Sequence, residues 1–309
     1  MAPLKPGQRT EVWLYDIETG EQVLRWSTDQ VRLESPNWTE DDRLVLNADG
    51  DLFTLSARGD DAPVKIELPG LPPANNDHCL VPGTNLMVAS CDDKHLYLVD
   101  LAGGVDPVLI SGEDQGRWHY LHGVSPDGRE VAWTAARDTD QGRVRSICCS
   151  PVEPVAMGTA VTPGLRQVTP EHGQPNGSEY SPDGQWIWIN SEKESSVVGH
   201  QQIFRIPVEG ALDGSGEQFT LDQRVNWFPH LSPDGRRIVY LSYEPGVDGH
   251  PADLPVVLRE LLPGEPDEQG RATHRDLVSL LGGQGTINVN SWAPDSRWFC
   301  YIAHPLGDD

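Results

Sequence analysis

Three histidines stand at matching places in the sequence, each shortly before a tight turn that recurs along the chain. They are His78, His122 and His230, and Asp77 and Glu179 lie close to the same turns. Imidazole and carboxylate ligands suit a divalent ion such as Zn²⁺, Mn²⁺ or Fe²⁺, and we expect His78, His122, His230 and Asp77 as ligands. A neutral histidine can instead act as a general base, so we expect catalytic roles for His122, His230 and Glu179. A third interpretation is that these side chains only line a water-filled channel.

Asparagine recurs upstream of the same turns and offers a second set of candidate side chains. The amides could bind sugar hydroxyls, or they could form Asx turns that hold crossing loops. Trp227 could stack on a sugar ring or act as a wedge between neighbouring sheets. We predict a small polar or sugar ligand, and the candidate binding residues are Asn76, Asn176, Asn226, Trp227, Asn288, Glu244 and His250.

The turns that these residues precede form a repeat. The copies are Ser125-Pro126-Asp127-Gly128, Ser181-Pro182-Asp183-Gly184, Ser232-Pro233-Asp234-Gly235 and Ala293-Pro294-Asp295-Ser296, with worn copies at Thr39-Glu40-Asp41-Asp42 and Val81-Pro82-Gly83-Thr84. Proline presets φ at the second turn position, aspartate bonds its own backbone, and glycine accepts a positive φ. Alternating apolar residues follow each turn, which indicates a hairpin. Six copies spaced by roughly 40 to 60 residues are typical of propeller blades.

The repeat predicts an all-β protein, a six-bladed β-propeller formed as one domain by residues 1–309. A hairpin at residues 10–26 has no inner partner before it, and the last repeat, at 287–303, has no outer pair after it. We expect this hairpin to complete the last blade and close the ring, which removes exposed sheet edges. The expected blades are 28–70, 71–113, 114–166, 167–219, 220–276, and 277–309 with 1–27. The strand before each turn should line the channel, so polar residues from all blades should converge at one mouth.

These repeated hairpins, each followed by an aromatic-rich strand, resemble the six-bladed propeller of the TolB family over nearly the whole chain. That fold hosts periplasmic scaffolds, peptidase propellers and metal-dependent oligogalacturonate lyases, so the resemblance implies a fold and leaves the function open. The lyase branch is similar in that it uses channel histidines and a divalent metal. Its His-Pro-His turn is absent here, and the matching place reads Asn226-Trp227-Phe228.

Composition narrows the class of partner. The chain has a formal net charge of −24, which argues against nucleic acids and anionic membranes as partners. The five cysteines lack metal spacing and indicate buried thiols in a reducing compartment. No signal-like segment or membrane-spanning run is visible, so we expect a cytoplasmic location. Residues 282–286 are rich in glycine but lack the strand-to-helix context of a nucleotide-binding loop, which argues against a nucleotide cofactor. We expect this glycine loop to fold into the channel mouth instead.

Two classes of function follow from the sequence. The first is a cytoplasmic enzyme that acts on a carbohydrate or related polar metabolite in the channel, by metal-dependent elimination or isomerisation with histidine as acid or base. The second is a non-catalytic TolB-like scaffold that holds a protein or ligand on one face. The enzyme predicts a bound metal, whereas the scaffold predicts an exposed apolar patch and a protein partner.

Overall fold

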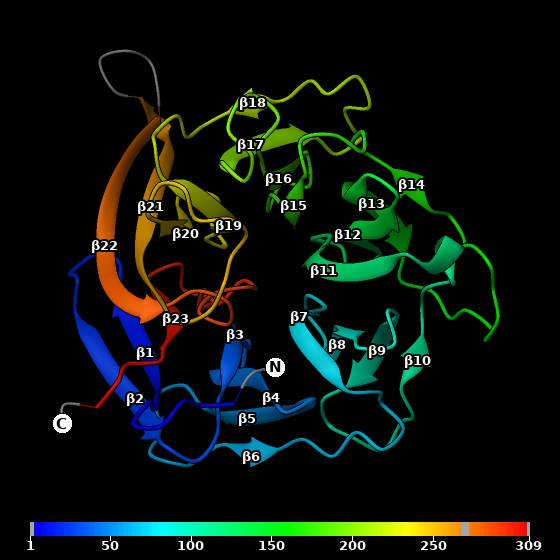
Figure 1. Ribbon diagram of the computed structural model, residues 1–309. Helices are drawn as coiled ribbons and strands as arrows, with labels where there is room; N and C mark the ends of the chain where they lie inside the picture. Colours follow the sequence, from blue (N-terminus) through cyan, green and yellow to red (C-terminus); the bar gives the residue numbers. More distant parts are fainter. Residues whose placement is uncertain (1–2, 267–271, 308–309) are drawn as a thin grey trace.

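The computed structural model describes residues 3–266 and 272–307 and contains six antiparallel sheets arranged as blades around a central channel (Figure 1). Blade one contains β3 (Glu34–Trp38), β4 (Arg43–Ala48), β5 (Asp51–Ser56) and β6 (Val64–Lys65). Blade two contains β7 (Ala74–Leu80), β8 (Leu86–Cys91), β9 (Leu96–Asp100) and β10 (Val108–Leu109). Blade three contains β11 (Trp118–Val124), β12 (Glu130–Thr139), β13 (Gly142–Pro151) and β14 (Arg166–Gln167). A single 3-10 turn, η1 (Asp114–Gly116), precedes β11. The six-bladed β-propeller expected from the repeat is confirmed.

The other three blades follow the same order from the channel outward. Blade four contains β15 (Asn176–Tyr180), β16 (Trp186–Ser191), β17 (Gln202–Pro207) and β18 (Glu217–Gln218), and blade five contains β19 (Val225–Leu231), β20 (Ile238–Tyr243), β21 (Leu254–Pro266) and β22 (Ala272–Gly282). Blade six contains β23 (Trp298–Ala303), β1 (Thr10–Asp16) and β2 (Gln22–Thr28), with Trp292 bridging Phe299 on the inner side. Strand β22 runs past residue 276, where the expected fifth blade ended. Within the described ranges, no helix is long and apolar enough to cross a membrane.

The repeated turns are stabilised by their own side chains. The Ser232 hydroxyl donates to Asp234 Oδ1 at 2.6 Å and accepts the backbone N–H of Arg237 at 3.1 Å. Gly235 has a φ of +70°, which glycine adopts without steric cost. The serines at 125 and 181 make the same hydroxyl–carboxylate contact. These contacts fix where each innermost strand ends.

The N-terminal hairpin closes the ring. Strand β1 lies between β2 and β23, and its pairing with β23 runs from Glu11 opposite Ala303 to Asp16 opposite Trp298. The guanidinium of Arg297 donates to the buried Asp16 carboxylate through Nε at 2.8 Å. The expected closure by residues 10–26 is therefore confirmed.

Apolar side chains fill the spaces between adjacent blades. Between blades four and five, for example, Trp188 and Ile203 pack with Leu231, Ile238 and Tyr240. All five cysteines are buried free thiols, as expected. Because the blades are held by these interfaces, the innermost strands have fixed positions around the channel.

The innermost strands of five blades carry an irregularity near their middle. The pairing register shifts between Glu34 and Asn37, and it shifts at the equivalent places in β7, β11, β15 and β19. Ser35, Gly177 and Phe228 lie at these shifts with positive φ. A β-bulge re-aims the neighbouring side chains, which here brings polar groups into the channel.

A loop at residues 283–290, which we call the channel loop, lies on the channel side of β19, β23 and β3 (Figure 1) and contacts the innermost strands of blades three, four and five. Ile287, Asn288 and Val289 are each exposed by 1% or less. The Gly285 carbonyl accepts the N–H of Ser35 at 2.7 Å, which joins the loop to blade one. The glycine segment thus folds into the channel as the sequence indicated, and a cavity lies at the mouth where the innermost strands begin.

Candidate functional site

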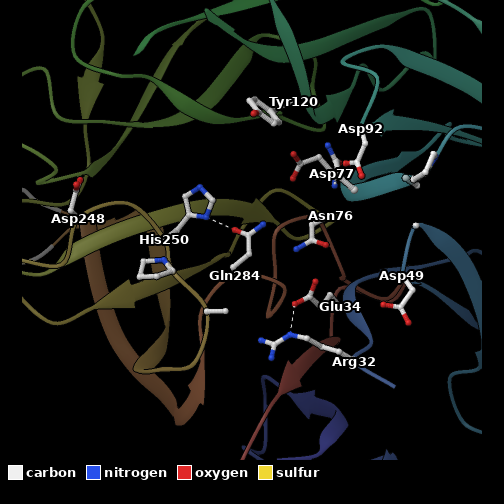
Figure 2. A pocket seen from close by; sticks show the side chains of 16 residues that line it. Arg32, Glu34, Asp49, Asn76, Asp77, Asp92, Tyr120, Asp248, His250 and Gln284 are labelled. Atoms are coloured by element: carbon white, nitrogen blue, oxygen red, sulfur yellow. Dashed lines mark hydrogen bonds and ion pairs between the residues drawn. The ribbon is translucent and has the colours of Figure 1, made fainter. Parts of the chain in front are cut away.

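The cavity at the channel mouth has a volume of about 730 Å³ and is lined by residues from several blades and loops (Figure 2). We call it the mouth cavity. Its polar lining comprises Arg32, Glu34, Asp49, Asn75, Asn76, Asp77, Asp92, Tyr120, Asp248, His250 and Gln284, and its apolar lining includes Pro73, Ala74, Pro251 and Ala252. A space of this size accommodates a small metabolite.

Glu34 and Arg32 form a buried pair in the mouth cavity. Arg32 Nε donates to Glu34 Oε1 at 2.7 Å, and Arg32 Nη2 donates to Asp253 Oδ1 at 3.1 Å. Burial raises the pKa of Glu34, although the neighbouring Arg32 and, to a smaller extent, the Asn76 side chain oppose this shift. The second carboxylate oxygen, Oε2, is buried and has no hydrogen-bond partner among the described residues. This oxygen can accept a hydrogen bond from a bound molecule.

Asp77 is the second buried carboxyl group of the mouth cavity. Burial raises its pKa to about 7, although the Asn288 side chain opposes the shift. The ring of Tyr120 lies near the Asp77 side chain (Figure 2), and burial raises the pKa of that phenol as well. Beside it, Asn76 Oδ1 accepts from Asn47 Nδ2 at 2.7 Å, which fixes the amide. Asp77 can therefore hold or release a proton near neutral pH.

His250 is held in the mouth cavity by the channel loop and by aromatic neighbours. Its Nδ1 is hydrogen-bonded to Gln284 Oε1, and its ring lies 4.5 Å from that of Trp227 and 5.0 Å from that of Phe228. Burial lowers the pKa of His250 to about 4, so the imidazole is neutral at neutral pH. Nδ1 donates to an amide oxygen, and Nε2 is then the acceptor nitrogen, which points away from Gln284 in Figure 2.

A second polar group lies beside the channel loop. His230 Nδ1 is 2.6 Å from Glu179 Oε2, and His230 Nε2 is 2.6 Å from the carbonyl oxygen of Ile287. Glu179 Oε1 also accepts the N–H of Leu231 at 2.7 Å and Asn290 Nδ2 at 2.7 Å. Both ring nitrogens of His230 therefore lie within hydrogen-bond distance of an oxygen of a neighbouring residue. The pair ties blades four and five to the channel loop.

The other two channel histidines are buried and uncharged. His78 Nδ1 is 2.7 Å from Asn37 Oδ1 and its Nε2 is 3.2 Å from Asn47 Oδ1. His122 Nδ1 is 3.4 Å from the carbonyl oxygen of Asn288. Burial lowers the pKa of both histidines to about 3. They contribute hydrogen bonds to the channel interior, away from the mouth cavity.

The four expected metal ligands do not converge on one point. Both ring nitrogens of His78 and of His230 are engaged in hydrogen bonds, whereas a histidine ligand needs a free lone pair. In residues 3–266 and 272–307, no three or more His, Cys, Asp or Glu side chains are grouped so as to hold a metal ion. As arranged, these residues do not fit a divalent ion, and the metal expected from the sequence stays a prediction.

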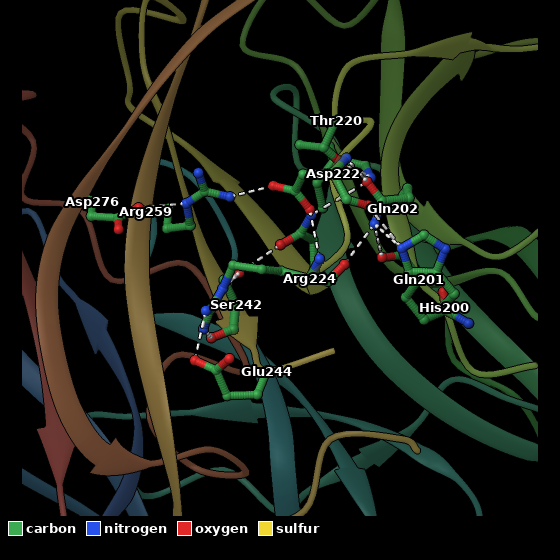
Figure 3. Close-up of polar contacts among 12 residues, drawn as sticks. His200, Gln201, Gln202, Thr220, Asp222, Arg224, Ser242, Glu244, Arg259 and Asp276 are labelled. Carbon is green, nitrogen blue, oxygen red and sulfur yellow. Dashed lines mark hydrogen bonds and ion pairs between the residues drawn. The ribbon is translucent and has the colours of Figure 1, made fainter. Parts of the chain in front are cut away.

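Glu244 belongs to a polar cluster between blades four and five (Figure 3), and Asn226 joins this cluster through its hydrogen bonds to Asp222 and Ser242. Asn226 is fully buried; its Nδ2 donates to Asp222 Oδ1 at 3.1 Å, and its Oδ1 accepts from Ser242 Oγ at 2.7 Å. Glu244 Oε1 accepts from Arg224 Nη1 at 2.7 Å. Neither residue lines the mouth cavity. These contacts anchor the connection between β18 and β19 against β20.

The remaining asparagines and the tryptophan also stabilise local structure. Asn176 Oδ1 accepts from Thr134 Oγ1 at 2.6 Å and from the N–H of Gly177 at 2.9 Å. Asn288 Oδ1 accepts the N–H of Gly285 at 2.8 Å within the channel loop. Trp227 is 3% exposed and packs in the core behind His250. Asn176 and Asn288 thus hold neighbouring backbone N–H groups, and Trp227 packs in the core; their predicted roles in ligand binding stay predictions.

Of the predicted site residues, Asn76, Asp77 and His250 lie together in the mouth cavity. His78, His122, His230 and Glu179 lie in the channel interior, and the other candidates lie in the blade framework. The sequence analysis missed Arg32, Glu34, Tyr120 and Gln284 as lining residues. Of these four residues, Glu34 could most easily have been found from the sequence. It precedes the worn turn at residues 39–42 in the same way that Asn75 to His78 precede the turn of their own repeat.

Comparisons with known proteins agree with this architecture. No family model matches the chain. It is 33% identical over 303 residues to an uncharacterized protein of Agrobacterium fabrum, covering 96% of this chain and 92% of that protein. A solved structure described as "putative TolB" from Agrobacterium tumefaciens has a TM-score of 0.79 and 32% identity, covering 96% of this chain and 99% of that one. A TolB from Acinetobacter baumannii has a TM-score of 0.48 and 17% identity over 89% of this chain and 64% of that one. The chain belongs to the family of TolB-like six-bladed β-propellers.

Proposed function

We propose that the protein is an enzyme that acts on a carbohydrate or related polar metabolite bound in the mouth cavity. One observation carries this proposal: Asp77 and His250 line the same cavity, with pKa values of about 7 and about 4. At neutral pH the carboxyl group is present in both protonation states and the imidazole is neutral. Titratable groups shifted in this way are typical of acid–base sites.

The proposed reaction is a proton transfer, as in an elimination or isomerisation. The Asp77 carboxylate removes a proton from a substrate carbon or hydroxyl, and the resulting acid returns it to the product or leaving group. His250 accepts a hydrogen bond from a substrate hydroxyl through Nε2, since Gln284 holds Nδ1. The amides of Asn76 and Gln284 and the ring of Tyr120 offer further contacts to a polyhydroxylated molecule.

Ligand binding followed by turnover tests the proposal. A panel of neutral sugars, amino sugars, sugar acids and polyols is screened by thermal shift, and any stabilising ligand is then followed for loss or rearrangement by NMR. Asp77→Asn should keep binding within a few-fold and lose at least about 100-fold in turnover, the scale of general acid–base catalysis. Asp106→Asn, on an exposed loop outside the cavity, is the matched control. Equal turnover by Asp77→Asn and wild type would remove Asp77 from the chemistry.

Metal dependence is a separate part of the proposal. Elemental analysis of protein purified without chelators, repeated for His78→Ala, His122→Ala and His230→Ala, measures it directly. Stoichiometric Zn, Mn or Fe that is lost in at least two variants would support a metal site in the channel. A metal-free wild type that stays metal-free after reloading would contradict it. The cytoplasmic location is tested by fractionation of the native host.

One observation favours the scaffold as a second candidate. Val197, Val198 and Leu221 are 58%, 87% and 72% exposed, and their loops lie at the face where the innermost strands begin. Exposed apolar side chains on one face are typical of sites for protein partners. Val198→Asp combined with Leu221→Asp should abolish co-purification of a specific partner and leave small-molecule binding unchanged. Unchanged co-purification would contradict this candidate.

A further inference from the structure

We infer that the ligand of the mouth cavity carries a positively charged nitrogen, an ammonium or a guanidinium, beside its hydroxyl groups. This inference rests on the proposed function, because it takes the mouth cavity to be the binding site. It specifies the class of substrate as an amino sugar or a similar aminated polyol. It also excludes sugar acids and phosphorylated sugars as preferred ligands.

The charges that line the mouth cavity are predominantly negative. Five carboxyl groups line it, those of Glu34, Asp49, Asp77, Asp92 and Asp248. Arg32 is the only lysine or arginine among the lining residues that the structure describes, and both Glu34 and Asp253 already engage it. A carboxylate or phosphate on the ligand would therefore meet repulsion and no uncommitted cation.

Two further arginines of β13 act on lining residues without lining the cavity themselves. Arg145 influences the titration of His250 and of Tyr120, and Arg143 influences that of Tyr120 but donates to Asp138 through Nε at 2.8 Å. Arg145 Nη1 donates to Gln174 Oε1 at 2.9 Å. His250 itself is neutral. An anionic ligand would thus have to compete with existing contacts.

Glu34 provides a built site for a hydrogen-bond donor. The residue is 2% exposed, and Arg32 fixes its Oε1. Its Oε2 is buried and has no hydrogen-bond partner of good geometry among the described residues, and the Asn76 side chain is the polar group that lies near the carboxylate. A buried carboxylate oxygen without a partner is costly, and the cost disappears when a ligand donates to it. An ammonium offers three donors and no acceptor, so it matches such an oxygen better than a hydroxyl does.

The carboxyl groups also differ in depth. Glu34 and Asp77 are buried, whereas Asp49, Asp92 and Asp248 are exposed. Exposed charges of one sign around a cavity attract a counter-charged ligand from solution, and buried ones hold it. The described residues contain no group of three or more metal-ligating side chains, which favours an organic cation that brings its own donors over a bare metal ion.

Matched ligand pairs that differ by one amino group test the inference. Glucosamine is compared with glucose and galactosamine with galactose by isothermal titration calorimetry, with glucuronic and galacturonic acids as anionic probes. We expect each amino sugar to bind about ten-fold or more tightly than its neutral partner, the scale of one charge-assisted hydrogen bond. The two acids should bind more weakly than the neutral sugars.

Two variants locate the effect. Glu34→Gln should reduce the preference for the amino sugar about ten-fold, with folding checked by circular dichroism because Arg32 loses one of its two carboxylate partners. Asp248→Asn, at the exposed rim, should reduce the preference two- to three-fold at low salt and leave it unchanged at high salt, since exposed charges are screened.

The outcomes separate this inference from the proposed function. Neutral sugars that bind as tightly as amino sugars, or acids that bind best, would overturn the inference and leave the enzyme proposal standing. Binding of Mn²⁺ or Zn²⁺ alone, with no response to any amine, would replace the organic cation by a metal. Failure of all neutral, acidic and aminated probes to bind would overturn both.

Discussion

Burial shifts the pKa values of Asp77 and His250 in opposite directions, and both changes favour the uncharged form. Asp77 has a raised pKa and His250 a lowered one because each would lose hydration as an ion. Glu34 lies in the same cavity but differs, because Arg32 offsets part of the cost of its charge. A single cavity therefore holds one carboxyl poised to exchange a proton and another that is paired with a cation.

The pKa of Asp77 predicts how its replacement changes stability with pH. Between about pH 4 and pH 7 the unfolded chain releases this proton while the folded chain keeps it, so Asp77 lowers stability as pH rises, by up to about 1.4 kcal/mol per pH unit. Asp77→Asn removes this effect. The difference in unfolding free energy, variant minus wild type, should increase from about pH 4 to pH 7 and then level off. Urea unfolding at several pH values measures it, and a pH-independent difference would contradict the assignment.

At the scale of elements, closure of the ring depends on β1, which pairs with β23, a strand far from it in the sequence. Leu14 in β1 is 4% exposed and packs with Leu44, Leu46 and Ile302 between blades six and one. Leu14→Ala should lower the free energy of unfolding by about 2–5 kcal/mol. Leu24→Ala in β2, where the side chain is 43% exposed, is the matched control and should change it by less than about 0.5 kcal/mol. Similar losses in both variants would contradict a closure role for the β1 interface.

The channel loop allows a second prediction at this scale. Gly285 has a φ of +88°, and a Cβ there would lie 2.6 Å from Cγ and Cδ of Glu34. Gly285→Ala should displace Glu34, lower stability by about 1–3 kcal/mol and weaken ligand binding in the mouth cavity. Gly83→Ala is the control, because Gly83 has a φ of +70° and open space around its Cβ position. Calorimetric titration would refute the prediction if both variants bound ligand equally well.

Local turn chemistry explains why the blades were predictable. The signal of each turn lies in four consecutive residues, as in Ser232 to Gly235, so no tertiary information is needed to see it. Glu34 and Gln284 were not predictable in the same way. They become lining residues of the mouth cavity only when the channel loop packs against the innermost strands in the folded protein. The pairing of His230 with the Ile287 carbonyl likewise depends on that loop. The sequence predicted that polar residues gather at the channel mouth. It did not predict that some, such as His250, line the mouth cavity while others, such as His230, lie in the channel interior.

At the scale of the whole molecule, buried neutral histidines make the propeller sensitive to acid. Burial lowers the pKa to about 3 for His78, His122 and His304 and to about 4 for His250. Below about pH 6.5 these histidines bind protons in the unfolded chain but stay unprotonated in the folded chain. Each histidine therefore lowers the free energy of unfolding by up to about 1.4 kcal/mol for each unit that the pH falls. Asp77 has the opposite pH dependence and cancels the effect of one histidine.

The melting temperature should therefore fall steeply as the pH drops from about 6.5 to 4.5. His78→Gln keeps a polar side chain at a fully buried position and cannot titrate in this range, so its melting temperature should depend less on pH than that of the wild type. Circular dichroism melts of both proteins in matched buffers test this. Parallel pH dependences would show that His78 does not contribute.

The pairing of β1 with β23 also sets an order of events during synthesis. Strand β1 ends at Asp16, and β23 begins only at Trp298, so β1 is synthesised long before the strand that it pairs with. At about 5–20 residues per second, that interval is on the order of 15–60 s. Until then the nascent chain presents β1 with an unsatisfied edge, while blades one to five can already form. The ring therefore closes only after β23 has been made and has paired with β1.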